Sequence, residues 1–159
     1  MELEEKIGKL LRQRGLTIAT AESCTGGMIA NRITNVSGAS DYFEAGLVTY
    51  SNRAKTAFLS VPEEVIKNRG AVSAEVARLM AEGAKRVTDA DIGLSVTGIA
   101  GPTGGTVEKP VGTVYMGISC SLGTFVHHFL FTGTREEIKS QTSEAALAFV
   151  LDYLEGRVE

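Results

Sequence analysis

The residues best suited to covalent chemistry lie in a turn after a short apolar segment. Residues 16–21 (LTIATA) are typical of a strand, and Ser23 follows them, with Thr25 and the pair Gly26-Gly27 next. Each glycine costs about 1 kcal/mol inside a helix, so either two backbones pack closely here or a ligand lies against bare N–H groups. A serine at a helix N-terminus faces N–H donors that can hold an oxyanion. The alternative is that Ser23 or Thr25 only caps the helix.

Cys24 is an alternative nucleophile beside Ser23, because a thiolate attacks better than a hydroxyl at neutral pH. A catalytic cysteine needs a base, and the only histidines are the neighbours His127 and His128. Neighbours on a strand point to opposite faces, so at most one histidine can face a site, and the simpler interpretation makes both ordinary strand residues. Cys24 and Cys120 show no disulfide-framework or metal-ligand spacing. The sequence therefore predicts no metal site.

Without a histidine, a lysine can take the proton of Ser23 if burial lowers its pKa. Lys55 is the best-placed candidate, because it lies in the first turn of the helix predicted after the strand 43–50. If the strands are parallel, Lys55 and Ser23 lie at the same edge of the sheet. Tyr50 ends that strand and can relay or donate a proton. The alternatives are a surface lysine and a strand-end tyrosine without a catalytic role.

A third turn is rich in glycine and reads TGIAGPTGGT over residues 97–106. Glycine at every third position exposes several N–H groups in succession, as in the backbone nests that bind anions. The loop lacks the Gly-Lys-Ser/Thr of a Walker A motif, and no helix follows it as the dinucleotide fingerprint requires. A wide turn and a cradle for phosphate or carboxylate both remain open.

Strands and helices alternate along the chain, which positions these turns. Predicted strands cover residues 16–21, 43–50, 91–97, 113–119 and 124–131, and predicted helices begin near residues 2, 25, 52, 62, 73 and 134. The short connection 121–123 makes the last two strands an antiparallel hairpin. The pattern predicts one α/β domain over residues 1–159, a three-layer α/β/α sandwich with a mixed, mostly parallel sheet and that one hairpin. Ligands bind beyond the carboxyl ends of such strands.

Composition agrees with a globular protein of this kind. Apolar residues make up 43% and charged residues 22% of the 159 residues, and a chain of this length buries about two thirds of its surface without metal or disulfides. A net charge of −3 argues against a nucleic-acid partner. There is no apolar run of ~18 residues for a membrane span, and the acidic N-terminus resembles neither a signal nor a transit peptide. We therefore expect a cytoplasmic protein with reduced thiols and no membrane partner.

Four segments in their order resemble the C-terminal domain of the competence/damage-inducible CinA family. They are Ala21–Gly27 (AESCTGG), Gly46–Lys55 (GLVTYSNRAK), Thr97–Pro102 followed by Gly104-Gly105, and Lys109–Val114 (KPVGTV). The resemblance runs from about Leu3 to Leu154. Stand-alone members of that family are nicotinamide-nucleotide amidohydrolases, and the amino-terminal molybdopterin-binding-like domain of longer members has no counterpart in these 159 residues.

The resemblance implies hydrolysis of the carboxamide of nicotinamide mononucleotide to nicotinate mononucleotide and ammonia, through a Ser/Lys acyl-enzyme and without a cofactor. It implies Ser23 as nucleophile, Lys55 as base and Tyr50 as an assisting residue. The implied substrate-binding residues are Cys24, Thr25, Gly26, Gly27, Thr97, Gly98, Gly101, Gly104, Gly105, Thr106 and Arg135. Arg135 follows Gly-Thr where we expect Gly-Asp, which leaves its role open.

Two other function classes fit the same sequence. One is a binding module that keeps the fold and the nucleotide cradle without useful turnover. The other is a competence- or DNA-damage-linked interaction protein, against which the acidic balance argues. We also expect a homodimer, because family members are often dimeric, twofold symmetry is the commonest arrangement, and the strand 124–131 has apolar side chains on both faces.

Overall fold

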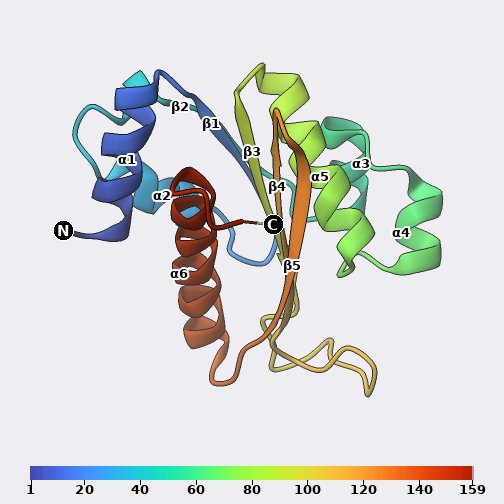
Figure 1. Ribbon diagram of the computed structural model, residues 1–159. Coiled ribbons are helices and arrows are strands. Elements are labelled where there is room, and N and C mark those ends of the chain that lie inside the picture. Colours follow the sequence, from blue (N-terminus) through green and yellow to red (C-terminus); the bar gives the residue numbers. More distant parts are fainter. Residues whose placement is uncertain (159) are drawn as a thin grey trace.

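Five strands form a single mixed sheet in the computed structural model, which describes residues 1–158 (Figure 1). The strands are β1 (Ile18–Glu22), β2 (Phe43–Val48), β3 (Ile92–Gly98), β4 (Thr113–Cys120) and β5 (Gly123–Leu130), in the spatial order β2-β1-β3-β4-β5. β1 pairs in parallel with β2 and β3, whereas β4 is antiparallel to both β3 and β5. Four strands therefore point the same way and β4 alone runs against them.

Helices cover both faces of the sheet. They are α1 (Leu3–Arg14), α2 (Met28–Thr34), α3 (Asn52–Leu59), α4 (Glu63–Arg69), α5 (Ala74–Thr88) and α6 (Arg135–Leu154), with a 3₁₀ turn at Ala39–Asp41. Figure 1 shows α1, α2 and α6 on one side and α3, α4 and α5 on the other. The predicted three-layer α/β/α sandwich with its mixed sheet and terminal hairpin is confirmed. None of the helices within residues 1–158 combines the length and apolar character needed to cross a bilayer.

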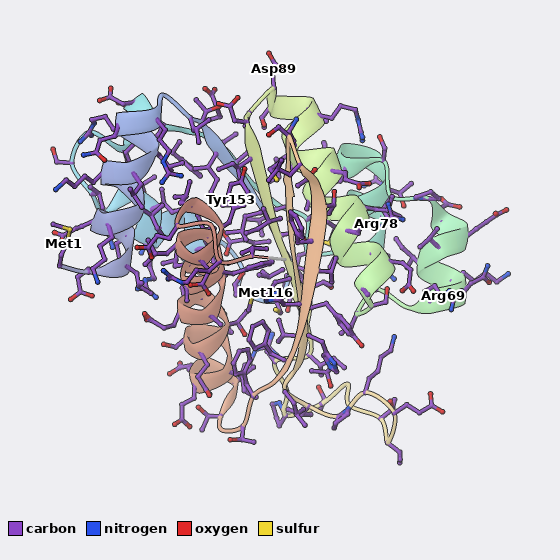
Figure 2. All side chains as sticks on the ribbon, viewed as in Figure 1. Met1, Arg69, Arg78, Asp89, Met116 and Tyr153 are labelled. Carbon is purple, nitrogen blue, oxygen red and sulfur yellow. The ribbon has the colours of Figure 1, made fainter. Side chains whose placement is uncertain are left out.

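Each helical layer has its own apolar core against the sheet. The larger core packs Leu11, Leu94, Met116 and Leu147 between the sheet and α1, α2 and α6, all fully buried. Figure 2 shows Met116 among the side chains that fill this space. The second core joins the end of β1 to α3, α4 and α5. Burial of each large side chain contributes about 1.5–3 kcal/mol, so the two layers hold the carboxyl ends of the central strands in place.

Helix α5 lies unusually close to the sheet. A Cβ at Gly93 on β3 would collide with the carbonyl oxygen of Ala81, so only glycine fits there. Ser95 Oγ, two residues further along β3, donates to the carbonyl oxygen of Ala77 at 2.6 Å. The close packing explains why Gly93 and Ser95 stand in this buried strand.

The predicted helix signals mostly hold, with one displaced boundary. Ser73 accepts from the N–H of Val76, and Thr134 forms a capping box with Glu137, as the sequence indicates. The second helix, expected from residue 25, begins at Met28 instead. Gly26 and Gly27 have φ of +61° and +105°, left-handed values that no right-handed helix contains. Residues 23–27 therefore form a turn, called the serine turn below.

Candidate active site

Ser23 and Lys55 meet at the carboxyl edge of the parallel strands. β1 and β2 pair from Ile18↔Phe43 to Glu22↔Val48, so the two chains leave the sheet side by side. Ser51 caps α3 by accepting from the N–H of Ala54 at 3.0 Å, and the first turn of α3 directs Lys55 back over the edge. Lys55 Nζ lies 2.9 Å from Ser23 Oγ. The sequence prediction placed these two residues at one edge, and the structure brings them into hydrogen-bond contact.

The Lys55 amine is enclosed by oxygen atoms. The residue is 1% exposed, and Nζ donates to the backbone carbonyls of Thr49 at 3.0 Å and Tyr50 at 3.3 Å. No carboxylate in residues 1–158 forms an ion pair with it. Burial therefore lowers the pKa of Lys55.

The two carbonyls define what a neutral Lys55 does. A carbonyl oxygen only accepts, so a neutral amine gives its two hydrogens to Thr49 and Tyr50. Its lone pair is then left for the third neighbour, the hydroxyl of Ser23. Geometry and lowered pKa together suit a general base that removes the Ser23 proton.

The side chain of Tyr50 takes a different place from the one expected of a proton relay. It is 58% exposed, and its hydroxyl accepts from Arg135 Nη2 at 2.9 Å rather than contacting Ser23 or Lys55. Arg135 Nη1 also donates to the carbonyl of Gly101 at 2.6 Å. Arg135, whose role the sequence left open, thus joins the start of α6 to Tyr50 and to the glycine loop.

A pocket of about 280 Å³ opens directly over the Ser23–Lys55 pair. Figure 1 shows the loop between β3 and β4 extending beyond this end of the sheet, beside the start of α6. The pocket is lined by Ser23, Cys24, Tyr50, Asn52, Lys55, Ala71, Val72, Thr97, Gly98, Ile99, Ala100, Gly101, Thr103, Gly104 and Arg135. Sequence reasoning pointed to the glycine-rich loop but did not single out its residues Ile99, Ala100 and Thr103, and it missed Asn52, Ala71 and Val72 altogether. Asn52 had a usable signal, since it opens the helix that carries Lys55; Ala71 and Val72 had none.

Side-chain donors from the end of β3 and from the loop that follows it fix the Ala71-Val72 wall of the pocket. Thr97 Oγ1 donates to the carbonyl of Ala71 at 2.8 Å. Lys109 Nζ donates to the carbonyl of Arg69 at 2.8 Å and to that of Val72 at 2.6 Å. The Thr97 hydroxyl therefore supports the wall. We call residues 69–72 with these donors the clamped wall.

Several predicted binding residues do not line the pocket. The Thr25 hydroxyl is buried and donates to Glu22, and Gly26 and Gly27 supply the left-handed backbone of the serine turn. Gly105 lies further along the loop, against Val111. Thr106 closes a small turn with Lys109, whose backbone N–H donates to Thr106 Oγ1 at 2.9 Å.

The oxyanion donors expected from the second helix are already occupied. The backbone N–H groups of Ile29 and Ala30, in the first turn of α2, donate to the Glu22 carboxylate at 2.9 and 3.0 Å. The N–H groups of Cys24 and Thr25 donate to no oxygen atom among the residues that the structure describes. The donors available beside Ser23 therefore belong to the serine turn and not to the helix.

The thiol of Cys24 is poorly suited to attack. It is 6% exposed and packs on Ala100 and Ile138. Burial, reinforced by the nearby Glu22 charge and opposed by its own backbone N–H, raises the pKa of Cys24 to about 12. A thiol with that pKa is protonated at neutral pH.

The histidines lie elsewhere. His127 stacks on Phe149 and His128 on Tyr115, with ring centroids 4.1 and 4.4 Å apart, on opposite faces of β5 as strand alternation predicts. Neither lines the pocket. No group of three or more metal-ligating side chains occurs within the described residues.

The fold and this edge of the sheet define a class: an α/β protein with a buried Ser–Lys pair beneath a glycine-rich loop. The profile of the CinA C-terminal domain matches residues 1–154, and the chain belongs to that family. It is 54% identical over 153 residues to a CinA-like protein of Geobacter sp. (strain M21), covering 96% of this chain and 37% of that protein. It is 52% identical over 157 residues to a putative competence-damage inducible protein of Moorella thermoacetica, covering 99% and 38%. The chain thus spans less than two fifths of these relatives' length.

Solved structures agree with the family assignment. The competence/damage inducible protein CihA from Agrobacterium tumefaciens superposes with a TM-score of 0.90 at 39% identity, covering 96% of this chain and 95% of that one. The competence damage-inducible protein A (ComA) from Klebsiella pneumoniae gives a TM-score of 0.93 at 32% identity, with the same coverage.

Proposed function

We propose that the protein hydrolyses the carboxamide of nicotinamide mononucleotide, giving nicotinate mononucleotide and ammonia. The observation that carries this proposal is the 2.9 Å contact between Lys55 Nζ and Ser23 Oγ, with two carbonyls taking the other hydrogens of the amine. A buried amine and hydroxyl in contact beneath a pocket are what an acyl-transfer enzyme without histidine requires. The substrate follows from the family resemblance.

In the proposed reaction Lys55 removes the proton of Ser23, and Ser23 Oγ attacks the carboxamide carbon. The oxyanion is held by free backbone N–H groups of the serine turn, and each such donor contributes about 3 kcal/mol. Protonated Lys55 then returns its proton to the amide nitrogen, the C–N bond breaks, and ammonia departs. Lys55 next deprotonates a water molecule, which attacks the acyl-enzyme, releases the carboxylate and restores the serine.

To bind the nucleotide portion of the substrate, the pocket needs a cationic side chain for the phosphate and backbone N–H groups close to it. Arg135 and Lys55 are the two basic side chains that line the pocket, and Lys55 is in contact with Ser23. Arg135 is therefore our candidate partner for the substrate phosphate, since a guanidinium pairs well with phosphate oxygens. The loop from Gly98 to Gly104 offers backbone N–H groups along the same wall.

The test is to incubate the pure protein with nicotinamide mononucleotide and EDTA and to follow ammonia and nicotinate mononucleotide. Both should accumulate in equal amounts, and Ser23→Ala should produce neither. Nucleotide binding without ammonia would instead favour the binding module. Salt-dependent DNA binding would favour an interaction protein.

We also expect this activity to operate in a homodimer in the cytoplasm. Both cysteines are buried and free, which suits a reducing compartment. The exposed Leu130 on β5 adds apolar surface to the strand on which the dimer expectation rests.

A further inference from the structure

Glu22 is a buried carboxylate that the proposed reaction does not use. It is the last residue of β1, directly before Ser23, and is 1% exposed. Its Oε1 accepts from the Thr25 hydroxyl at 2.6 Å and from the Ile29 N–H at 2.9 Å, and its Oε2 accepts from the Ala30 N–H at 3.0 Å. Within residues 1–158 it has no cationic partner. All its contacts are neutral donors.

Capping helix α2 does not by itself require a buried carboxylate. The helices α3, α5 and α6 are capped by the neutral hydroxyls of Ser51, Ser73 and Thr134. Such local caps contribute about 1 kcal/mol each, whereas a buried charge is costly unless fully hydrogen-bonded. At α2 the acceptor is Glu22, which lies seven residues before Ile29 on β1, on the other side of the serine turn. A group that spans the turn fixes the turn as well as the helix.

The backbone of Glu22 holds the start of the serine turn in place. Glu22 is paired with Val48 and Val96 in the sheet, and its carbonyl accepts from the Thr49 N–H at 2.9 Å. The serine turn is therefore held at its start by the sheet, in its middle through Thr25 and at its end through α2. Ser23 Oγ and the free N–H groups of Cys24 and Thr25 lie between these fixed points.

We propose that Glu22 is a positioning residue for the reaction at Ser23: it fixes the serine turn, so that the Ser23 hydroxyl faces Lys55 and the free N–H groups of the turn keep their place beside that hydroxyl. The role rests on the proposed function, and Glu22 acts through the turn without touching substrate. Because it also occupies the N–H groups of Ile29 and Ala30, the developing oxyanion is left to the serine turn.

Glu22→Gln tests this positioning role with almost no change in shape. The amide oxygen of glutamine can keep the Thr25 and Ile29 contacts, but its NH₂ faces the N–H of Ala30, so a donor meets a donor. We expect kcat for nicotinamide mononucleotide to fall about 10- to 100-fold, as for a nucleophile misplaced by ~1 Å. KM should stay within about twofold, and the pH profile of kcat should keep its shape. The matched control is Glu44→Gln, an exposed glutamate on the neighbouring β2, which should change nothing.

A second measurement tests the role of Glu22 without depending on the proposed substrate. A fluorophosphonate reacts with an activated serine: the Ser23 Oγ–P bond forms, fluoride leaves, and Lys55 takes the proton. Mass spectrometry should show slower labelling of Ser23 in Glu22→Gln by about the same factor as kcat. If the wild type labels rapidly but releases no ammonia, the substrate assignment fails while the role of Glu22 is still tested by the labelling rates.

Three outcomes would contradict the positioning role of Glu22. A folded Glu22→Gln protein with wild-type kcat and labelling rate, whatever its melting temperature, would make Glu22 merely structural. Loss of one limb of the pH profile would mean that Glu22 exchanges protons itself. If Glu22→Gln does not fold, Thr25→Val decides, because it removes one contact of the Glu22 carboxylate and keeps the shape of the side chain. That variant should lower kcat about fivefold, the effect of one hydrogen bond, and an unchanged kcat would contradict the proposal.

Discussion

Replacing Lys55 with methionine removes an ionisable amine from the interior while keeping most of the side chain's volume. We expect Lys55→Met to be at least as stable as the wild type at pH 7 and to release ammonia at least about 100-fold more slowly, the usual contribution of a general base. Loss of activity together with retained stability would mark Lys55 as a residue kept for chemistry. Lys55→Arg should also be inactive, because a guanidinium does not give up its proton.

The stability effect is a balance of two terms. Methionine forfeits the hydrogen bonds of Nζ to Ser23 Oγ and to the carbonyls of Thr49 and Tyr50, about 1 kcal/mol each and roughly 3 kcal/mol together. Against this, burying an ammonium group without a counter-charge costs several kcal/mol even after relaxation. The second term equals or exceeds the first, so the substitution is neutral or stabilising near neutral pH.

The direction of the pH dependence is the sharper test. Burial lowers the pKa of Lys55 in the folded protein below the value of ~10.4 that it has in the unfolded chain. Between those two pKa values the unfolded chain binds more protons, so the free energy of unfolding of the wild type rises with pH. The variant lacks this group. Its stability advantage should therefore shrink as the pH rises from 7 to 10.

Urea unfolding of both proteins at pH 7, 8, 9 and 10 measures this difference, because titrations common to both chains cancel. Lys9→Met, at an exposed lysine on α1, is the control and should show no comparable trend. A difference that stays constant or grows with pH would refute the argument that Lys55 is buried at a cost. An active Lys55→Arg protein would remove Lys55 from the role of base.

Four further expectations concern the pocket and the assembly. Ser23→Ala should still bind nicotinamide mononucleotide but release no ammonia, and mass spectrometry of a quenched wild-type reaction should find the acyl adduct on Ser23; an adduct on Cys24 would reverse the assignment. Cys24→Ala should keep most of the activity, and the wild type should resist iodoacetamide at pH 7, because a pKa of about 12 keeps the thiol protonated. Arg135→Ala should raise KM at least about 10-fold by removing the phosphate partner, with kcat little changed; a fall in kcat alone would place Arg135 in the chemistry. Light scattering at micromolar concentration should give a dimer, and a monomer mass would contradict it.

The sequence predicts that Ser23 and Lys55 lie at the same edge of the sheet, because this placement depends only on a general property of parallel sheets. Neighbouring parallel strands end at one edge, and β1 and β2 are neighbours. Their 2.9 Å contact depends on how α3 returns over the edge, which tertiary packing decides. The role of Tyr50 shows the same limit. The sequence suggested its hydroxyl as a partner of Lys55, whereas the atom in contact is its backbone carbonyl.

Two other features lay beyond a local interpretation of the sequence. A glutamate at the end of a strand normally points to solvent, and only the tertiary structure puts the Glu22 carboxylate against Ile29 and Ala30. The sequence indicates that the consecutive glycines after Thr25 are unusual for a helix. Their positive φ places them in the turn before α2. The N–H groups of the first turn of α2 donate to Glu22 and not to the pocket. Ala71 and Val72 reach the site through contacts more than twenty-five residues apart in sequence.

The clamped wall bears on how a ligand enters this pocket. Hydrogen bonds from Thr97 and Lys109 fix the carbonyls of Arg69, Ala71 and Val72, so ligand binding has little backbone left to order along this wall. Association should then carry a small entropic penalty and a heat-capacity change set by the apolar area that the ligand itself buries. A rigid wall also rejects a ligand that is slightly too large, because the pocket cannot widen there without breaking those bonds. A new substrate range at this site would therefore come more readily from the exposed loop residues 103–108 than from the wall.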